Sequence, residues 1–442
     1  MAGVAAEKIK ILEQQFRLSA SQIIDIAKQF ETEMMSGLAG QHGSLKMLRT
    51  FMQKPSGNET GTFITIDFGG TNIRLQLVNL LGEGRYEVKQ QQSFFLKDPC
   101  GIYDYTSQKA TANDLFDFIA RQIEDLVEQD QLYPLGHTFS FPCRQLKANR
   151  AVLISWTKEF KTSGVEGQEI TGLLEKALAK RGLSQVIPAA IINDTTGTLL
   201  AASYGDPRAD IGSICGTGHN TCYLEPLEPA TRAPMILNME SGNFNKFPLT
   251  VYDQALDRAS EKPGEQPLEK AVSGHYIGEI SRLILQDLID GGLLFKGKNL
   301  DLAANINPIT AGDLAQILAD DTQDLIHISH WLQTTGYPSP LPLEDRQALK
   351  DIASLVATRS ARLVAATYIG ILRHIDPELT RQHVIGVDGS MFEKMPGYRT
   401  KIQEVLQEIY RDKADQVSLV LTKDGSGIGA AIAAATCVGG RN

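Results

Sequence analysis

One run of residues constrains this chain more than any other: Phe-Ile-Thr-Ile-Asp-Phe-Gly-Gly-Thr-Asn-Ile-Arg, at positions 63–74. Its alternating apolar and β-branched residues predict a strand that ends near Asp67, and two glycines then turn the chain into a second strand at 73–79. Because glycine has no Cβ atom, the backbone N–H groups of this turn can face outward and surround phosphate oxygens. Asp67 would then hold the Mg²⁺ that accompanies such phosphates, directly or through water. Taken alone, the run is equally compatible with an ordinary β-hairpin closed by a glycine turn.

A second unit of the same kind follows at 211–225, where Gly216, Thr217 and Gly218 separate two short apolar strands. Each turn offers backbone N–H groups and a threonine hydroxyl, from Thr71 in the first turn and Thr217 in the second. One such hairpin is weak evidence for phosphate binding, but two in one chain suggest that both turns bind the same polyphosphate from opposite sides. We therefore expect a nucleotide to lie between two lobes, each of which supplies one turn.

The length of the chain and its mixture of elements indicate two α/β lobes. At 442 residues the chain exceeds the ~250–300 residues at which one hydrophobic core usually divides. Capping patterns mark two helices, through Ser19 with Gln22 in the first and Thr111 at the start of the second. Periodicity and turn residues predict helices at 7–38, 111–129 and 167–181, three antiparallel strands at 62–95, and strands at 186–192, 384–388 and 417–421.

Two better-known nucleotide motifs are present only in incomplete form. Residues 292–299 match a P-loop except at the last position, where Asn299 replaces the Ser or Thr that would bind Mg²⁺. Residues 425–430 fit the glycine pattern of a dinucleotide-binding turn, but no acidic residue follows that could bind a ribose. We interpret this second motif as a strand-to-helix turn that places amides near a nucleotide.

Composition and charge argue against several classes of partner. The net charge is −9 and no cluster of Lys and Arg is present, so we expect neither nucleic acid nor a membrane surface as a partner. The five cysteines lack both disulfide and metal-ligand spacing, which is typical of free thiols in the cytoplasm. The first residues show no signal-peptide core, and the weakly polar stretch at 427–440 is too short to span a bilayer. Nothing in the sequence indicates an oligomeric state.

Taken in order, the motifs of this chain resemble those of the hexokinase family, the sugar kinases that share an ATPase core with actin and the heat-shock ATPases. The resemblance runs nearly from end to end and is carried by residues 67–74, 139–142, 156–158, 193–198, 216–220, 238–243, 269–274 and 386–390. It implies a two-lobed, actin-like (ribonuclease H-like) α/β fold with mixed sheets, helices and a ligand cleft between the lobes. The smaller lobe would comprise 62–193, joined by the helix at 426–442, and the larger 194–425, with 1–61 packed on it.

The resemblance also implies an activity, the Mg²⁺·ATP-dependent phosphorylation of the 6-hydroxyl group of glucose or a related hexose, the first step of glycolysis. The sugar hydroxyl must lose a proton as the γ-phosphoryl group arrives, and Asp194, after the strand at 186–192, is our candidate general base. Asp194 could instead be a helix N-cap, and Lys158, our other catalytic candidate, could be an ordinary surface lysine. A site must replace the hydrogen bonds that a hexose makes with water, and similarity assigns this role to Ser140, Thr157, Lys158, Asn193, Asp194, Asn220, Glu240 and Glu269.

The same resemblance assigns the nucleotide contacts. Asp67 would anchor Mg²⁺, through water, and the two turns would bind the phosphates through Gly69, Gly70, Thr71, Asn72, Arg74, Gly216, Thr217 and Gly218. An adenosine floor would be formed by Asp388, Gly389, Gly425, Ser426 and Gly427. Two of these assignments have plain alternatives, since Arg74 could face outward from its strand and glycine-rich turns often serve only tight packing.

The chain departs from the family pattern at a few positions. Ser241 stands where an aromatic residue is usual, and the segment after Asn243 is shorter. His219 replaces a small or apolar residue in the second turn, where it could bond a phosphate, although we favour a solvent-facing side chain. A sugar sensor with little turnover is the alternative function, and a sugar-independent ATPase would leave Glu240 and Glu269 unexplained. The preferred hexose is not indicated.

Overall fold

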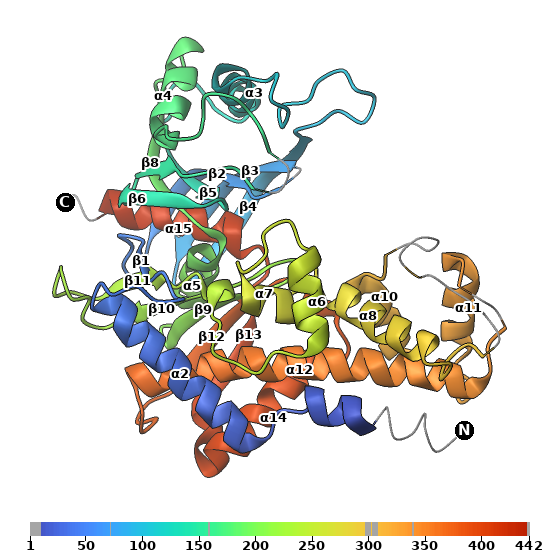
Figure 1. Ribbon diagram of the computed structural model, residues 1–442. Coiled ribbons are helices and arrows are strands. Elements are labelled where there is room, and N and C mark those ends of the chain that lie inside the picture. Colours follow the sequence, from blue (N-terminus) through green and yellow to red (C-terminus); the bar gives the residue numbers. More distant parts are fainter. Residues whose placement is uncertain are drawn as a thin grey trace.

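The computed structural model describes residues 10–70, 72–157, 160–296, 302, 308–337 and 340–439. It contains two mixed sheets, of five and six strands, with helices packed on both (Figure 1). The five-stranded order is β4-β3-β2-β5-β8, and the larger sheet repeats this pattern as β11-β10-β9-β12-β13 with β1 added at the edge. In each sheet three consecutive antiparallel strands are followed by two parallel ones.

The five-stranded sheet contains the first glycine turn and confirms the predicted antiparallel strands. Its strands are β2 (Thr60–Phe68), β3 (Asn72–Gly82), β4 (Arg85–Phe95), β5 (Tyr133–Phe139) and β8 (Val186–Ile192). The apolar faces of α3 (Ala112–Glu124) and α4 (Ile170–Lys180) share one core with this sheet, and α15 (Gly425–Gly439) contacts its other face. A small hairpin, β6 (Cys143–Lys147) and β7 (Arg150–Leu153), lies beside it.

The six-stranded sheet contains the second glycine turn. Its strands are β1 (Leu48–Arg49), β9 (Ala209–Cys215), β10 (His219–Glu225), β11 (Met235–Asn238), β12 (His383–Asp388) and β13 (Val417–Leu421). Helix α5 (Asp194–Gly205) contacts β9, β10, β11 and β12. The other helices are α2 (Ala20–Leu38), α6 (Val251–Ala259), α7 (Pro267–Val272), α8 (Ile277–Asp290), α10 (Ala311–Leu318), α11 (Ile326–Thr335), α12 (Leu343–Ile375), α13 (Ser390–Lys394) and α14 (Tyr398–Tyr410).

Local capping signals set the helix ends, and one of them corrects a prediction. The single helix expected over 7–38 is wrong, because a first helical segment at 10–16 ends before Ser19, which has extended backbone and starts α2. The Ser19–Gln22 capping box itself is confirmed, and Thr111 is the N-cap of α3, where it also forms a capping box with Asp114. Gly182 follows α4 with a φ of +74°, the conformation that favours glycine after a helix.

The longest helix, α12, runs across the lower half of the view in Figure 1 and contacts α2, α8 and α14. Its 33 residues are numerous and apolar enough to cross a membrane by length and composition, but 83% of its most apolar window is buried inside the protein. Within the part of the chain that the structure describes, α12 is therefore a helix of the hydrophobic core that packs around the larger sheet.

Helices α5 and α15 cross between the two sheets with their backbones in contact (Figure 1). A Cβ atom added to Gly429 would lie 2.2 Å from the carbonyl oxygen of Gly197, and one added to Gly425 would lie 2.8 Å from Cα of Thr198. Any larger residue would therefore push the helices apart. The motif at 425–430 forms the start of α15, which follows β13 after a link at 422–424, so it lies at the strand-to-helix junction but is itself helical.

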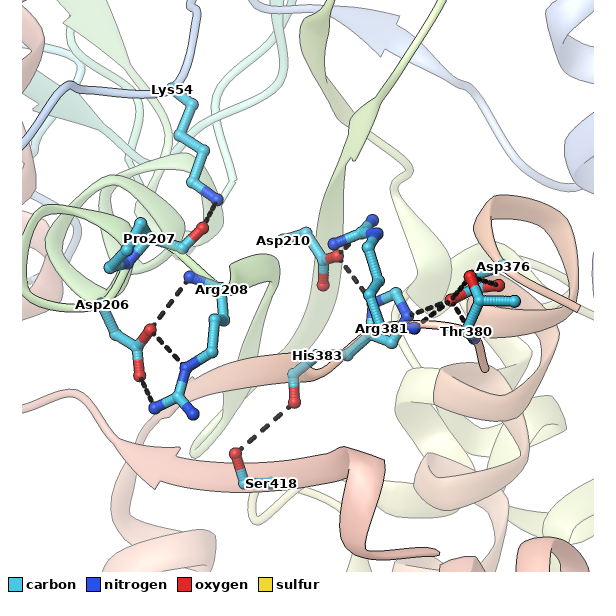
Figure 2. Close-up of polar contacts among 10 residues, drawn as sticks. All are labelled: Lys54, Asp206, Pro207, Arg208, Asp210, Asp376, Thr380, Arg381, His383 and Ser418. Carbon is cyan, nitrogen blue, oxygen red and sulfur yellow. Dashed lines mark hydrogen bonds and ion pairs between the residues drawn. The ribbon is translucent and has the colours of Figure 1, made fainter. Parts of the chain in front are cut away.

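A buried ionic cluster lies at the edge of the larger sheet where β12 begins (Figure 2). His383 is fully buried, with Nδ1 2.7 Å from Asp210 Oδ2 and Nε2 3.1 Å from Asp376 Oδ2. A guanidinium nitrogen of Arg381 lies 2.9 Å from the same oxygen of Asp210. Because Asp388 ends the same strand, the cluster and the candidate site lie at opposite ends of β12.

Candidate active site

The carboxyl ends of strands from both sheets bring a group of acidic residues together. Asp67 lies near the end of β2, Asp388 ends β12, and Asp194 begins the helix that follows β8. Asp67, Asp388 and Glu240 each lie close enough to Asp194 for its charge to contribute to the rise of their pKa values. Residues predicted separately from four motifs therefore lie in one place.

Asp67 and Asp424 both pair with the guanidinium of Arg74, and the sequence analysis did not identify Asp424. Arg74 Nη2 donates to Asp67 Oδ2 at 2.7 Å and lies 2.5 Å from Asp424 Oδ1, so Arg74 is not the outward-facing residue of the alternative. Burial raises the pKa of Asp67; the Arg74 guanidinium opposes this rise, and the charges of Asp424 and Asp194 add to it. Gln76 Nε2 in turn donates to Asp424 Oδ2 at 2.6 Å. No local signal marked Asp424, because an Asp-Gly pair ordinarily indicates only a turn.

The first glycine turn is open where a ligand would approach. A Cβ atom added to Gly70 would meet no described atom within 4 Å, whereas one at Gly69 would contact the side chain of Ser140 at 3.7 Å. The N–H group of Ser140 donates to the carbonyl of Phe68 at 3.1 Å, which places Ser140 beside this turn. Asn72 is exposed at the start of β3. The predicted residues Thr71 and Lys158 lie outside the described residues.

The backbone of the second glycine turn is hydrogen-bonded to the segment that follows α7. The carbonyl groups of Gly216 and Thr217 accept the N–H groups of Gly274 at 2.8 Å and His275 at 3.0 Å. The Thr217 side chain is exposed. The expectation of a solvent-facing His219 is wrong, because its side chain packs inside the sheet and only 3% of the residue is exposed.

Glu240 is half-buried near other acids and accepts hydrogen bonds from two asparagines, Asn238 and Asn220. Asn238 Nδ2 donates to Glu240 Oε1 at 2.7 Å, and Asn220 Nδ2 donates to Asn238 Oδ1 at 2.9 Å. Burial raises the pKa of Glu240; the Asn238 bond opposes this rise, and the charges of Asp194 and Glu269 add to it. The alternative of a solvated surface acid is therefore wrong for Glu240. Asn238 was part of a recognised motif, but the sequence assigned it no role.

Two further positions complete this side of the site. Glu269 Oε2 accepts the backbone N–H of His219 at 2.9 Å, which joins α7 to the start of β10. Ser241, which replaces the expected aromatic residue, is fully buried, with its hydroxyl 2.7 Å from that of Thr221.

The N-cap of α5 is Asn193 and not Asp194, so the capping alternative for Asp194 is wrong. Asn193 Oδ1 accepts the N–H group of Thr196 at 3.1 Å. Asp194 is the first residue of the helix, and its Oδ1 accepts the N–H group of Thr195 at 2.8 Å. The positive end of the helix dipole therefore lies at a carboxylate that is not the N-cap residue.

The predicted adenosine floor consists of residues with strong internal packing. Asp388 accepts N–H groups from Gly389 at 2.7 Å and Gly425 at 3.0 Å, and burial raises its pKa. Gly389 has a φ of +116°, and a Cβ atom there would lie 2.5 Å from the carbonyl oxygen of Cys215. A Cβ atom on Gly427 would lie 2.0 Å from Gln76 Oε1. Packing alone explains these glycines, so contact with adenosine stays a prediction.

Two remaining observations concern the edges of the site. Thr157 is half-buried, and the backbone N–H of Trp156 before it donates to Glu166 Oε1 at 2.7 Å. Among the described residues, no three His, Cys, Asp or Glu side chains form a group that could hold a metal ion.

Comparisons with known proteins identify relatives over nearly the whole length. Family models described as hexokinase match residues 8–204 and 210–436. The chain is 35% identical to the hexokinase of Kluyveromyces lactis over 98% of this chain and 93% of that protein, and 34% identical to Hexokinase-2 of Candida albicans over 97% and 92%. It is 36% identical to mouse Hexokinase-1 over 97% of this chain, but spans only 45% of that longer protein.

Solved structures agree with these relatives. A crystal structure of a hexokinase matches with a TM-score of 0.86 at 32% identity, covering 98% of this chain and 99% of the other. The hexokinase of Schistosoma mansoni complexed with glucose matches with a TM-score of 0.85 at 31% identity, covering 99% and 100%. These likenesses confirm the predicted two-lobed α/β fold with mixed sheets.

Proposed function

This chain belongs to the hexokinase family and is a hexose kinase, and we propose that it transfers the γ-phosphoryl group of Mg²⁺·ATP to the 6-hydroxyl group of glucose or a closely related hexose. One observation carries the proposal for this site. Asp194, at the start of α5, lies close enough to Asp67, Asp388 and Glu240 for its charge to raise their pKa values, and these residues come from both sheets and from separate motifs.

The hexose would lie against the acids and amides on the larger sheet's side. Carboxylate and amide oxygens accept hydrogen bonds from vicinal hydroxyls, and an acceptor as shielded from water as the half-buried Glu240 penalises any ligand that lacks the matching donor. The glucose bound to the similar Schistosoma enzyme supports a hexose of this shape. The proposed contacts are Ser140, Thr157, Lys158, Asn193, Asp194, Asn220, Glu240 and Glu269.

The proton of the 6-hydroxyl group would pass to a carboxylate oxygen of Asp194 as the oxygen bonds the γ-phosphorus and the bond to ADP breaks. The N-terminus of α5 supports this role because its dipole favours a carboxylate at that position. A proton taken by Asp194 can later leave to water, which restores the base.

The nucleotide would lie between the two glycine turns, with its phosphates on the turn amides and its base toward Asp388. The residues fit Mg²⁺ as well: Asp67 is an oxygen ligand with 22% of its side chain exposed, beside the open position at Gly70. Bound Mg²⁺ would neutralise phosphate charge during transfer. Asp67, through water, is the proposed anchor, and Arg74 would move from it toward the phosphates.

We also propose how the lobes divide and where the enzyme works. Residues 62–193 with the C-terminal helix would form the smaller lobe, and 194–425 with the N-terminal residues the larger. Closure of the lobes on the sugar would expel water, which otherwise competes as the phosphoryl acceptor. The free thiols of the described residues support a reducing, cytoplasmic location.

A coupled ADP-release assay with a panel of hexoses tests the proposal. We expect rapid, sugar-dependent ADP formation with glucose or a close relative, and ATP hydrolysis without sugar that is far slower. Glucose and ATP binding without turnover would instead indicate a sensor. Equal rates with and without sugar would refute the kinase mechanism.

A further inference from the structure

His219 joins the hairpin behind the second glycine turn to a proposed sugar ligand. It is the first residue of β10 and pairs with Cys215 at the end of β9, so it closes the hairpin that carries Gly216, Thr217 and Gly218. Its side chain is buried, and its backbone N–H donates to Glu269 Oε2 at 2.9 Å. One residue therefore connects the proposed phosphate turn with α7.

The ring of His219 has a defined tautomer. Its Nδ1 lies 3.0 Å from the carbonyl oxygen of Ile214, and because a carbonyl only accepts, Nδ1 carries the hydrogen. The other nitrogen, Nε2, is buried and has no hydrogen-bond partner in the described part of the chain. Burial lowers the pKa of His219 to about 4, so the ring is neutral under ordinary conditions. Apart from a long contact of 4.0 Å between Nδ1 and Cys215 Sγ, the bond from Nδ1 to Ile214 is the polar anchor of this side chain among the described residues.

The bond between His219 Nδ1 and the Ile214 carbonyl crosses the hairpin next to its glycine turn. Ile214 belongs to β9 and His219 to β10, so the bond links the two strands through a side chain in addition to the backbone ladder. Space at the tip is limited, since a Cβ atom on Gly218 would lie 2.9 Å from Glu269 Oε2. A shift of His219 would therefore move both the N–H group that holds Glu269 and the neighbouring Asn220, whose side chain bonds Asn238.

We propose that His219 is a positioning residue for hexose binding: its bond to Ile214 holds the backbone N–H that orients the Glu269 carboxylate toward the sugar. The inference rests on the proposed hexose site. His219 itself neither touches the sugar nor exchanges a proton in the reaction.

The test compares His219→Phe, which keeps the ring volume without the donor, with His219→Asn, whose side-chain N–H can replace Nδ1–H. Glucose affinity is measured by calorimetry without ATP, and KM and kcat by the coupled assay. We expect His219→Phe to weaken glucose binding and raise the glucose KM about five- to tenfold, with kcat at saturation changed less than twofold. His219→Asn should stay within about twofold of wild type.

A double-mutant cycle with Glu269→Gln separates this role from a general loss of structure. If His219 acts through Glu269, His219→Phe should have little further effect on glucose affinity in the Glu269→Gln background. Full additivity, or a His219→Asn variant as weak as His219→Phe, would overturn the inference. His219→Val serves the same comparison if the Phe variant does not fold. Failure of the proposed function itself would be distinguishable, because the wild type would then bind no glucose, or bind it without sugar-dependent ADP release, whatever the His219 variants do.

Discussion

Removing the imidazole of His383 should destabilise the larger sheet's side of the molecule by about 3–5 kcal/mol, the cost of breaking a buried ion pair from one side. The substitution His383→Leu keeps much of the volume but removes both donors. Asp376 would retain the N–H groups of Thr380 at 2.7 Å and Arg381 at 3.2 Å. Asp210 would retain only its pair with Arg381 and already has one buried oxygen without a hydrogen-bond partner in the described residues (Figure 2).

The two tryptophans allow this cost to be measured on the relevant side of the protein. Trp331 belongs to the core of the larger sheet, and Trp156 to the core of the smaller one. In a Trp156→Phe background, Trp331 fluorescence therefore reports urea unfolding of the larger sheet's side. At a slope of about 3 kcal/mol per molar urea, the midpoint should fall by roughly 1–1.7 M.

Two variants and one change of pH complete this test. Arg381→Ala removes the half-exposed partner of Asp210 and should lower the free energy of unfolding by about 1 kcal/mol or less. Adding Asp210→Asn to His383→Leu should instead recover part of the lost stability, because it removes the buried charge left without its histidine partner. Burial alone would raise the pKa of Asp376, but bonds from His383 and backbone N–H groups lower it below 3.8. Stability from Asp376 is therefore full above that value and lost as pH falls through the lowered pKa. A His383→Leu shift no larger than that of Arg381→Ala, or no recovery with Asp210→Asn, would refute the reasoning.

Three further predictions concern the proposed active site. Asp194→Asn should lower turnover about 10²–10⁴-fold, with glucose affinity by calorimetry changed only a few-fold; undiminished turnover would exclude the base. Because the pKa of Glu240 is raised, its charged form opposes folding once pH exceeds that pKa. Glu240→Gln should therefore raise the thermal midpoint at pH 7 while weakening glucose binding, and wild-type glucose affinity should fall as pH drops through the raised pKa, above 4.5. A lower midpoint for Glu240→Gln would contradict this account. Gly389→Ala, with a new Cβ atom 2.5 Å from Cys215 O, should cost about 1–3 kcal/mol in urea unfolding, and an unchanged midpoint would show that the strand ends can separate.

Much of the local architecture was predictable because its causes lie a few residues apart. The capping boxes of Ser19 with Gln22 and Thr111 with Asp114 each join residues three positions apart. The antiparallel strands over 60–95 follow from alternation and tight turns in the same way. Even so, the sequence did not show which residue caps α5. Asn193 and Asp194 are both residue types that suit an N-cap, and only the helix geometry distinguishes them.

The sequence by itself determined the strands, the two glycine turns and the ordered motifs that identify the family, because each depends on residue types at short, regular spacing. Only the tertiary structure decided that Asp424 meets Gln76 across 348 positions of the chain, that the Gly197–Gly429 contact sets the helix crossing, and that His219 points into the protein. These outcomes depend on which elements pack together. Burial and long-range contact are properties of the assembled chain, and no short window of residues contains them.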